Sequence, residues 1–319
     1  MEKQQVRNCV VIVGSGMMGS AIGAMSALAG NKTVLVDKSP DKAAAGKEKA
    51  MECIRLRVEN GLASRESAQK AEQLISCSDN LEEAVKEAGL VIEAIVENLE
   101  AKQVLFAGLD DLLPAKVPIC SNTSGLRITD ISAKCKHPER TMTTHFWLPA
   151  HLVPLVEVVM GDKTDEALAG KICEELKRWK KAPVLVKRDL PGQLANRIFQ
   201  AIIREAIDIV ASGLASAEDV DTAISCGMAM RFPKWGPLMH LDAIGLELGL
   251  SVQDTVLPSI CAEKTANDYI RRLVQEGKTG AGKGQGFYDW SERNIQEDIS
   301  KRDKFIVEAV KAVAKIDGE

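Results

Sequence analysis

The chain has 319 residues, of which 45% are hydrophobic and 27% charged, so it is long enough for two domains with separate cores. Its net charge of −4 offers no basic surface for nucleic acid or for an anionic membrane. The apolar run behind the polar N-terminus is too short for a secretory segment or a membrane span. Eight scattered cysteines with no CxxC pair indicate reduced thiols and no metal site, so we expect a cytoplasmic protein.

The first 190 or so residues alternate short β-branched runs with longer segments rich in Ala, Leu, Glu and Lys. Strands that alternate with helices predict βαβ units around a mainly parallel sheet. The predicted strands are residues 10–13, 33–36, 90–94, 117–120, 141–145, 155–159 and 183–186. The helices predicted between them are residues 21–29, 40–60, 99–112 and 165–177.

The pattern becomes helical after Pro191-Gly192. Apolar residues recur with helical spacing over residues 194–213, and Ser216 followed by Asp219 is typical of a further helix start. We therefore predict an α/β fold, with an N-terminal domain built on a mainly parallel sheet over residues 1–190 and an all-α domain over residues 191–319. Broad apolar faces over residues 194–210 and 238–250 predict a homodimer.

A glycine-rich turn follows the first predicted strand and opens an Ala-rich helix. Gly14 permits the tight turn, Gly16 lets the backbone approach a pyrophosphate, and Gly19 lets helix and strand pack closely. Phosphates bind well at the positive end of a helix. The predicted dinucleotide-binding residues of this turn are Gly14, Gly16, Met17, Met18 and Gly19.

Asp37 ends the next predicted strand. A carboxylate there accepts hydrogen bonds from the adenosine ribose and repels a 2′-phosphate, which favours NAD over NADP. Lys38 follows directly and softens this preference. The alternative interpretation is that Asp37 only caps the following helix.

Several further motifs stand in an order that resembles the 3-hydroxyacyl-CoA dehydrogenase family over nearly the full length. They occupy residues 93–102, 121–126, 145–149, 155–159, 191–197 and 284–288. The resemblance implies that Glu97 and Lys102 line the nicotinamide side of the cofactor. It likewise implies that Ser124 and Asn196 hold the reacting oxygen.

His145 ends one predicted strand and Glu157 lies in the next. Neighbouring strands can bring the two side chains together, and a carboxylate on one ring nitrogen fixes the tautomer and strengthens the other nitrogen as a base. We therefore predict that His145 transfers the proton and that Glu157 orients it. The alternative is a core histidine without a catalytic role.

The sequence also departs from the family. Leu148 takes the place of the asparagine in the usual His-Phe-x-Asn-Pro motif, and an apolar side chain cannot make the amide's hydrogen bonds. The serine and lysine that contact CoA in the acyl-CoA enzymes correspond to Cys53 and Asn60, although Arg55 and Arg57 offer charge nearby. These differences weaken the expectation of a CoA substrate.

Residues 227–237 resemble the branch of the family that acts on free acids, the gulonate and carnitine dehydrogenases. Arg231 in this loop is predicted to bind a substrate carboxylate, although it can also be read as a solvated surface residue. Trp147 and Trp235 would suit a quaternary ammonium such as carnitine, whereas Lys234 argues against a cationic substrate.

The function favoured by these residues is NAD-dependent hydride transfer between a free 3-hydroxy acid and its 3-keto acid. Residues 1–190 would then be the Rossmann domain that binds NAD, and residues 191–319 the helical domain for substrate binding and dimerisation. One alternative is a short-chain 3-hydroxyacyl-CoA dehydrogenase that acts on 3-hydroxybutyryl-CoA. A second is a non-catalytic NAD-binding structural protein. The expected partners are a small-molecule substrate and a second copy of the chain, with no nucleic acid and no membrane.

Overall fold

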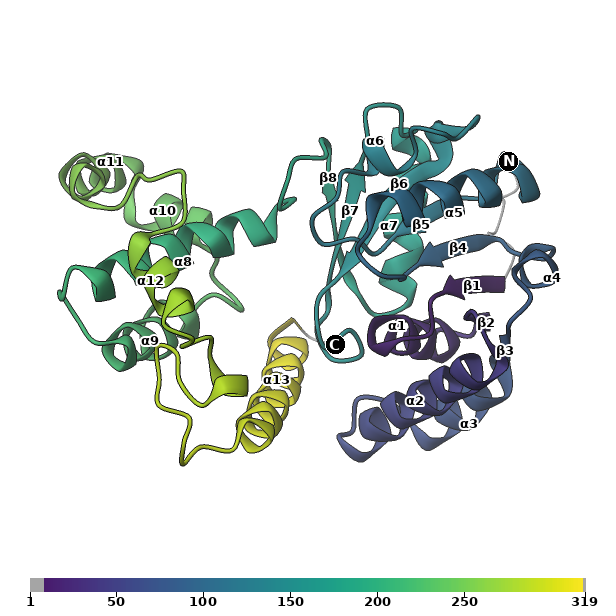
Figure 1. The fold of residues 1–319 in the computed structure, drawn as a ribbon, viewed down its shortest axis with the longest axis horizontal. Helices are drawn as coiled ribbons and strands as arrows, with labels where there is room; N and C mark the ends of the chain where they lie inside the picture. The colour runs from purple at the N-terminus through teal and green to yellow at the C-terminus, as the bar shows by residue number, and fades with distance from the viewer. Residues whose placement is uncertain (1–8, 318–319) are drawn as a thin grey trace. The chain divides into compact units, whose positions relative to one another are not determined.

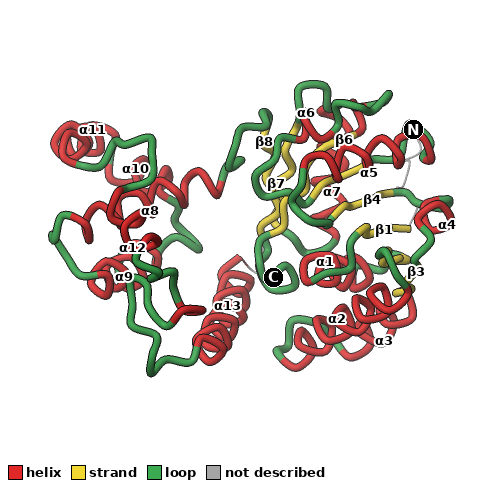
Figure 2. Tube along the Cα trace, viewed as in Figure 1, coloured by secondary structure: helices red, strands yellow, loops and turns green. Residues whose placement is uncertain are grey.

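A computed structural model of the chain describes residues 9–317 and divides into two units (Figure 1). The first unit extends to Ala195, and the second begins at Asn196. Strands occur in the first unit, whereas helices and loops make up the described part of the second (Figure 2). The predicted combination of an α/β unit and a helical unit is confirmed.

The first unit is built around one sheet with the strand order β3-β2-β1-β4-β5-β6-β7-β8. All neighbouring strands are parallel except β6 and β7, which are antiparallel. The order reverses between β1 and β4, and ligands of open α/β sheets bind at such a switch point. The strands are β1 (Cys9–Val13), β2 (Lys32–Val36), β3 (Ile75–Ser78), β4 (Leu90–Glu93), β5 (Ile119–Ser121), β6 (Thr141–Phe146), β7 (Leu155–Met160) and β8 (Ala182–Val186).

Buried side chains cover both faces of this sheet. Ile12 and Ile92 belong to a core cluster on one face, and Val11 and Val91 belong to a cluster on the other. Successive strand residues point to opposite faces, so a strand buried on both sides needs the continuous Val and Ile runs that the sequence shows.

Short polar side chains mark where several helices begin. Ser39, Asn98 and Asp165 each accept a hydrogen bond from a backbone N–H of the first helical turn that follows. The helices of this unit are α1 (Met17–Leu28), α2 (Pro40–Glu59), α3 (Arg65–Leu74), α4 (Leu81–Val85), α5 (Leu99–Leu112), α6 (Ile128–Ile131) and α7 (Glu166–Arg178), with a 3₁₀ turn η1 (Pro138–Arg140).

Helices joined by loops make up the described part of the second unit. Ser216 caps a helix that begins at the next residue, as its sequence context predicts. Its elements are α8 (Ala195–Ala211), α9 (Ala217–Cys226), η2 (Met228–Met230), α10 (Pro237–Ile244), α11 (Leu246–Val256), η3 (Leu257–Ser259), α12 (Asp268–Gln275), η4 (Ala281–Lys283) and α13 (Ile295–Asp317). Among the described helices, none combines the length and the apolar character needed to cross a bilayer.

Candidate active site

The glycine turn between β1 and α1 has the shape that a dinucleotide requires. Gly14 has a left-handed φ of +98°, and a Cβ there would lie 2.6 Å from the carbonyl oxygen of Ala94. A Cβ on Gly19 would lie 1.8 Å from the carbonyl oxygen of Gly14, so only glycine lets α1 begin this close to the strand. Gly16 has open space at the corresponding position. Its backbone is therefore open to approach by phosphates.

Asp37 lies just beyond β2, next to this turn. Its Oδ2 accepts hydrogen bonds from the N–H and the hydroxyl of Ser15, both at 2.9 Å, and its Oδ1 accepts one from the N–H of Lys38 at 2.8 Å. Partial burial raises the pKa of Asp37, but these hydrogen bonds outweigh it and lower the pKa below its usual value. Oδ1 keeps a lone pair that can accept from a ribose hydroxyl.

Ser15 is a residue that the sequence pattern did not single out. It is buried and links the glycine turn to Asp37, and its hydroxyl also lies 3.0 Å from the carbonyl oxygen of Lys42. Gly46 of α2 leaves room for it, because a Cβ there would lie 2.3 Å from the Ser15 Cβ. The residue between the first two glycines of the motif thus positions the carboxylate that is predicted to bind the ribose.

A polar network, buried at Glu93, Lys102 and Thr123, forms where β4 and β5 end. Lys102 Nζ lies 2.6 Å from Glu93 Oε1 and 3.3 Å from Glu97 Oε2. Glu97 Oε1 accepts hydrogen bonds from the Thr123 hydroxyl and from the N–H of Ser124 at 3.2 Å. These bonds and the Lys102 charge outweigh the effect of burial and hold the pKa of Glu97 below its usual value.

Two residues predicted for the nicotinamide side, Glu97 and Lys102, are therefore in contact, and Ser124 is bonded to the same carboxylate. Glu93 and Thr123 complete this network. Both lie within the sequence motifs, but the sequence alone gave neither of them a role. Glu93 is the last residue of its strand and was hidden inside an apolar run. A charged residue within such an apolar run is the sequence signal that could have marked Glu93 as a site residue.

His145 and Glu157 face each other across the antiparallel pair β6 and β7, where they are register partners. His145 Nδ1 lies 2.8 Å from Glu157 Oε2. The same oxygen accepts a hydrogen bond from Trp147 Nε1 at 3.0 Å, and Oε1 accepts from the N–H groups of Leu194 and Ala195 at 2.9 and 2.8 Å. The predicted pair is thus in direct contact, within a carboxylate site of four donors.

Burial alone would raise the pKa of Glu157. The hydrogen bonds from His145, Trp147 and the two backbone amides outweigh this effect and lower the pKa to about 2. Glu157 is therefore an anion across the physiological pH range. An ionised carboxylate on Nδ1 places the proton there and leaves Nε2 of His145 as the acceptor.

Asn196 and Arg231 belong to the second unit. Asn196 is half-buried at the start of α8. Arg231 is exposed after η2, with its backbone N–H bonded to Met228. Trp235 lies in the same loop and packs against His240 at 6.4 Å between ring centroids, whereas Trp147 contacts the carboxylate of Glu157 in the first unit.

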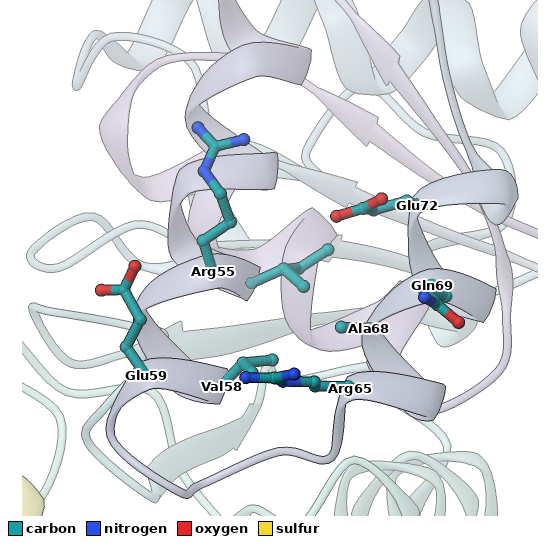
Figure 3. Close-up of a pocket in the computed structure, with 8 residues that line it drawn as sticks. Arg55, Val58, Glu59, Arg65, Ala68, Gln69 and Glu72 are labelled. Carbon is teal, nitrogen blue, oxygen red and sulfur yellow. The ribbon is translucent and has the colours of Figure 1, made fainter.

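The arginines considered for CoA have different environments. Arg57 is buried and donates to the carbonyl oxygens of His151 and Leu62, so it stabilises the fold and is not available for a phosphate. Arg55 is exposed and lines a groove of about 330 Å³ between α2 and α3 (Figure 3). Arg65, Glu59 and Glu72 line the same groove, so its charges are balanced.

The switch point in the sheet, the glycine turn and Asp37 define the first unit as a dinucleotide-binding domain of the Rossmann type. Among residues 9–317, the structure contains no cluster of three or more His, Cys, Asp or Glu side chains that would hold a metal ion.

Comparison with known proteins identifies the family. Residues 9–190 match the model of the 3-hydroxyacyl-CoA dehydrogenase NAD-binding domain, and residues 192–290 match the model of its C-terminal domain. The chain belongs to the 3-hydroxyacyl-CoA dehydrogenase family. It is an NAD-dependent oxidoreductase.

Individual relatives differ in the substrates that their names give. A probable 3-hydroxybutyryl-CoA dehydrogenase of Bacillus subtilis is 35% identical over 89% of this chain and 98% of its own length. An L-carnitine dehydrogenase of Oceanobacillus iheyensis is 28% identical over 95% of this chain and 97% of its own. The crystal structure of a 5-formyl-3-hydroxy-2-methylpyridine 4-carboxylic acid 5-dehydrogenase, an NAD⁺-dependent dismutase, matches with a TM-score of 0.88. It is 27% identical and covers 97% of this chain and 99% of its own.

Proposed function

We propose that the protein oxidises the hydroxyl group of a free 3-hydroxy acid, or reduces the matching 3-keto acid, with His145 and Glu157 as the acid–base pair. The observation that carries this proposal is the Glu157 carboxylate, which His145 Nδ1 approaches to 2.8 Å. Three further donors hold that carboxylate in place. A ring fixed in this way is ready to exchange a proton through Nε2.

NAD accepts the hydride in the oxidation, and NADH donates it in the reduction. In the oxidation His145 takes the hydroxyl proton, and in the reduction the protonated ring returns it. Glu157 keeps its charge throughout and stabilises the imidazolium. Ser124 and Asn196 would hold the reacting oxygen. Glu97 and Lys102 would line the nicotinamide side, Met17 and Met18 would lie against the phosphates with the glycines, and Asp37 would bind the ribose.

Two observations support a free acid over a thioester. Arg57 is occupied with backbone carbonyls, which leaves Arg55 as the exposed arginine of the two. The similarity to the carnitine dehydrogenase covers 95% of this chain, and that to the pyridine carboxylate dehydrogenase covers 97%. The names of both give substrates without CoA. We assign the carboxylate of such a substrate to Arg231, because a planar guanidinium binds a carboxylate through two parallel hydrogen bonds.

The second candidate is a 3-hydroxybutyryl-CoA dehydrogenase. The 35% identity with the Bacillus subtilis relative favours it, as does the exposed position of Arg55 on α2. The two candidates share the same proton-transfer chemistry and differ only in what holds the remote part of the substrate.

The test is a spectrophotometric NADH assay over free 3-hydroxy acids, gulonate, carnitine, pyridine carboxylate alcohols and acetoacetyl-CoA. We expect the highest kcat/KM with a free acid. Faster turnover of acetoacetyl-CoA than of any free acid would establish the second candidate. NADH binding without turnover of any compound would instead indicate a structural role for the NAD-binding fold.

A further inference from the structure

Gln193 connects two parts of the site that come from different loops of the first unit. Its side-chain Nε2 donates to the carbonyl oxygen of Thr123 at 2.9 Å. Thr123 in turn donates to Glu97 and is followed by Ser124. The next residue along the chain, Leu194, donates its N–H to Glu157 at 2.9 Å. One residue thus links the Ser124 loop with the carboxylate that orients His145.

Its amide has a defined orientation. The Gln193 side chain faces the backbone carbonyl oxygen of Thr123, and only the N–H₂ end of a glutamine can donate to a carbonyl oxygen. The other end, Oε1, is buried and has no hydrogen-bond partner within the described residues. Burying an unpaired acceptor costs free energy, so this side chain is not optimised for stability.

The backbone carries a second cost at the same residue. Gln193 has a φ of +53°, and it is one of two non-glycine residues with a positive φ in the described part of the chain. Residues held in this region cost free energy and gather at functional sites. Backbone strain and an unpaired side-chain acceptor therefore coincide at Gln193, a residue that is 6% exposed.

We propose that Gln193 is a positioning residue that fixes Ser124 relative to the His145–Glu157 pair. It does so through its bond to Thr123 and through the backbone turn that aims the N–H groups of Leu194 and Ala195 at Glu157. The proposal rests on the proposed site but not on the substrate, because it concerns distances between groups of the protein itself. Displacing a reacting group by about 1 Å lowers the rate about a hundredfold.

Two variants separate the side chain from the backbone. Gln193→Met keeps the size but removes both amide atoms, and Gln193→Gly removes the side chain while accepting the positive φ without strain. The matched control is Gln103→Met. Gln103 Nε2 also donates to a backbone carbonyl oxygen, that of Asp130, at 2.8 Å, and this bond links α5 to α6. Each variant is made in the full chain.

Hydrogen exchange tests the link without any substrate. We expect the N–H groups of Ser124 and Gly125, which bond to Glu97, to exchange faster in Gln193→Met and Gln193→Gly, while those of the central strands are unchanged. Unchanged exchange at Ser124 and Gly125 in both variants would overturn the proposal. A general increase across the sheet would assign Gln193 a purely structural role and would also overturn it.

Kinetics give the second readout, with the best substrate from the NADH assay. We expect kcat to fall tenfold to a hundredfold in both variants. NADH affinity should stay within about twofold, and a larger primary deuterium isotope effect is expected, because hydride transfer becomes more rate-limiting. Wild-type kcat in Gln193→Gly would refute the inference. An inactive wild-type protein would instead refute the proposed function and leave the exchange result to decide on Gln193.

Discussion

His145 Nδ1 and Trp147 Nε1 share one acceptor, the Oε2 atom of Glu157, at 2.8 and 3.0 Å. The indole and the imidazole come from the same end of β6, and their ring centroids lie 5.8 Å apart. Both donors are fixed by a carboxylate that is itself held by backbone amides. The imidazole therefore has little freedom to rotate, which is the condition for an oriented base.

Replacing His145 is the most direct test of the proposed acid–base pair. His145→Ala should lower kcat by about 10² to 10⁴, the usual contribution of general acid–base catalysis. NADH affinity should stay close to that of the wild type, because the lost group acts on the proton and not on the dinucleotide. Steady-state kinetics and NADH fluorescence titration measure the two effects. Retention of more than about a tenth of the activity would show that His145 is not the base.

The low pKa of Glu157 predicts that the free energy of unfolding depends on pH. Its pKa is about 2 in the folded protein against 4.5 in a free glutamate, so the folded state favours the anion. The resulting stabilisation, about 3 kcal/mol, is fully present above pH 4.5 and is lost as the pH falls toward 2. Urea unfolding should therefore show a gap between wild type and Glu157→Gln that narrows by about this amount over the same range.

The control for this measurement is Glu72→Gln, because Glu72 is exposed on α3. Its unfolding free energy should follow the wild-type curve. A gap between wild type and Glu157→Gln that stays constant from pH 7 to pH 3 would mean that the Glu157 hydrogen bonds do not favour the anion.

The fold was predictable where the sequence carries a strong period. Continuous Val and Ile runs identified the buried strands, and segments rich in Ala, Leu, Glu and Lys identified α2, α5 and α7. Strand β3 (Ile75–Ser78) was not predicted because it is an edge strand with polar residues, and its place in the sheet comes from pairing with β2. Helix α3 was missed for a related reason, since Ala68 and Ala71 are its buried residues and small side chains give little periodic signal.

Spacing and motifs predicted two contacts of the candidate site, His145 with Glu157 and Glu97 with Lys102, but not the groups that support them. His145 and Glu157 could be paired because they lie in neighbouring strands. The donors to Glu157 from Leu194 and Ala195 are backbone groups, which no sequence pattern shows. Arg57 illustrates the opposite error. Its charge suggested that it could bind a phosphate of CoA, but the side chain is buried and donates to backbone carbonyl oxygens.

Asp37 is predicted to set the choice of cofactor. Asp37→Ser removes the acceptor for the ribose hydroxyls and the repulsion of a 2′-phosphate, so the KM for NAD should rise and use of NADP should improve. The ratio of kcat/KM for NAD to that for NADP measures the change and should fall at least tenfold. Equal use of NAD and NADP by the wild type would contradict this role of the carboxylate.

The second unit is predicted to associate with a second copy of itself. Few of its described side chains are buried, and α8 contains no buried residue at all. Large apolar side chains are instead exposed on α10 and α11, among them Leu238 at 77%, Leu246 at 61% and Leu250 at 61%. A surface of this kind is typical of an interface. Light scattering at micromolar concentration should give the mass of a dimer, and Leu238→Lys with Leu250→Lys should favour the monomer.

A monomeric mass for the wild type would contradict that expectation. The matched control is Val104→Lys on α5 of the first unit, whose exposed apolar side chain is 63% accessible. This variant should keep the mass of the dimer, because it lies outside the helices assigned to the interface.

Arg231 is predicted to distinguish the two candidate substrates. A carboxylate that leaves water for a partly apolar pocket needs a cationic partner, and a thioester does not. A charge-assisted hydrogen bond of this kind contributes about 1.5–3 kcal/mol, which corresponds to about ten- to a hundredfold in affinity. Arg231→Met should therefore raise the KM for the best free acid by that factor, with a smaller effect on acetoacetyl-CoA.

Arg231→Lys should restore the affinity only in part, because an ammonium group lacks the planar fork that matches a carboxylate. Arg55→Met on α2 is the complementary variant. It removes the exposed arginine of the α2–α3 groove and should raise the KM for acetoacetyl-CoA without changing that for the free acid. If KM for the best free acid hardly changes in Arg231→Met while Arg55→Met impairs the thioester, the protein acts on acyl-CoA and Arg231 is a solvated surface residue.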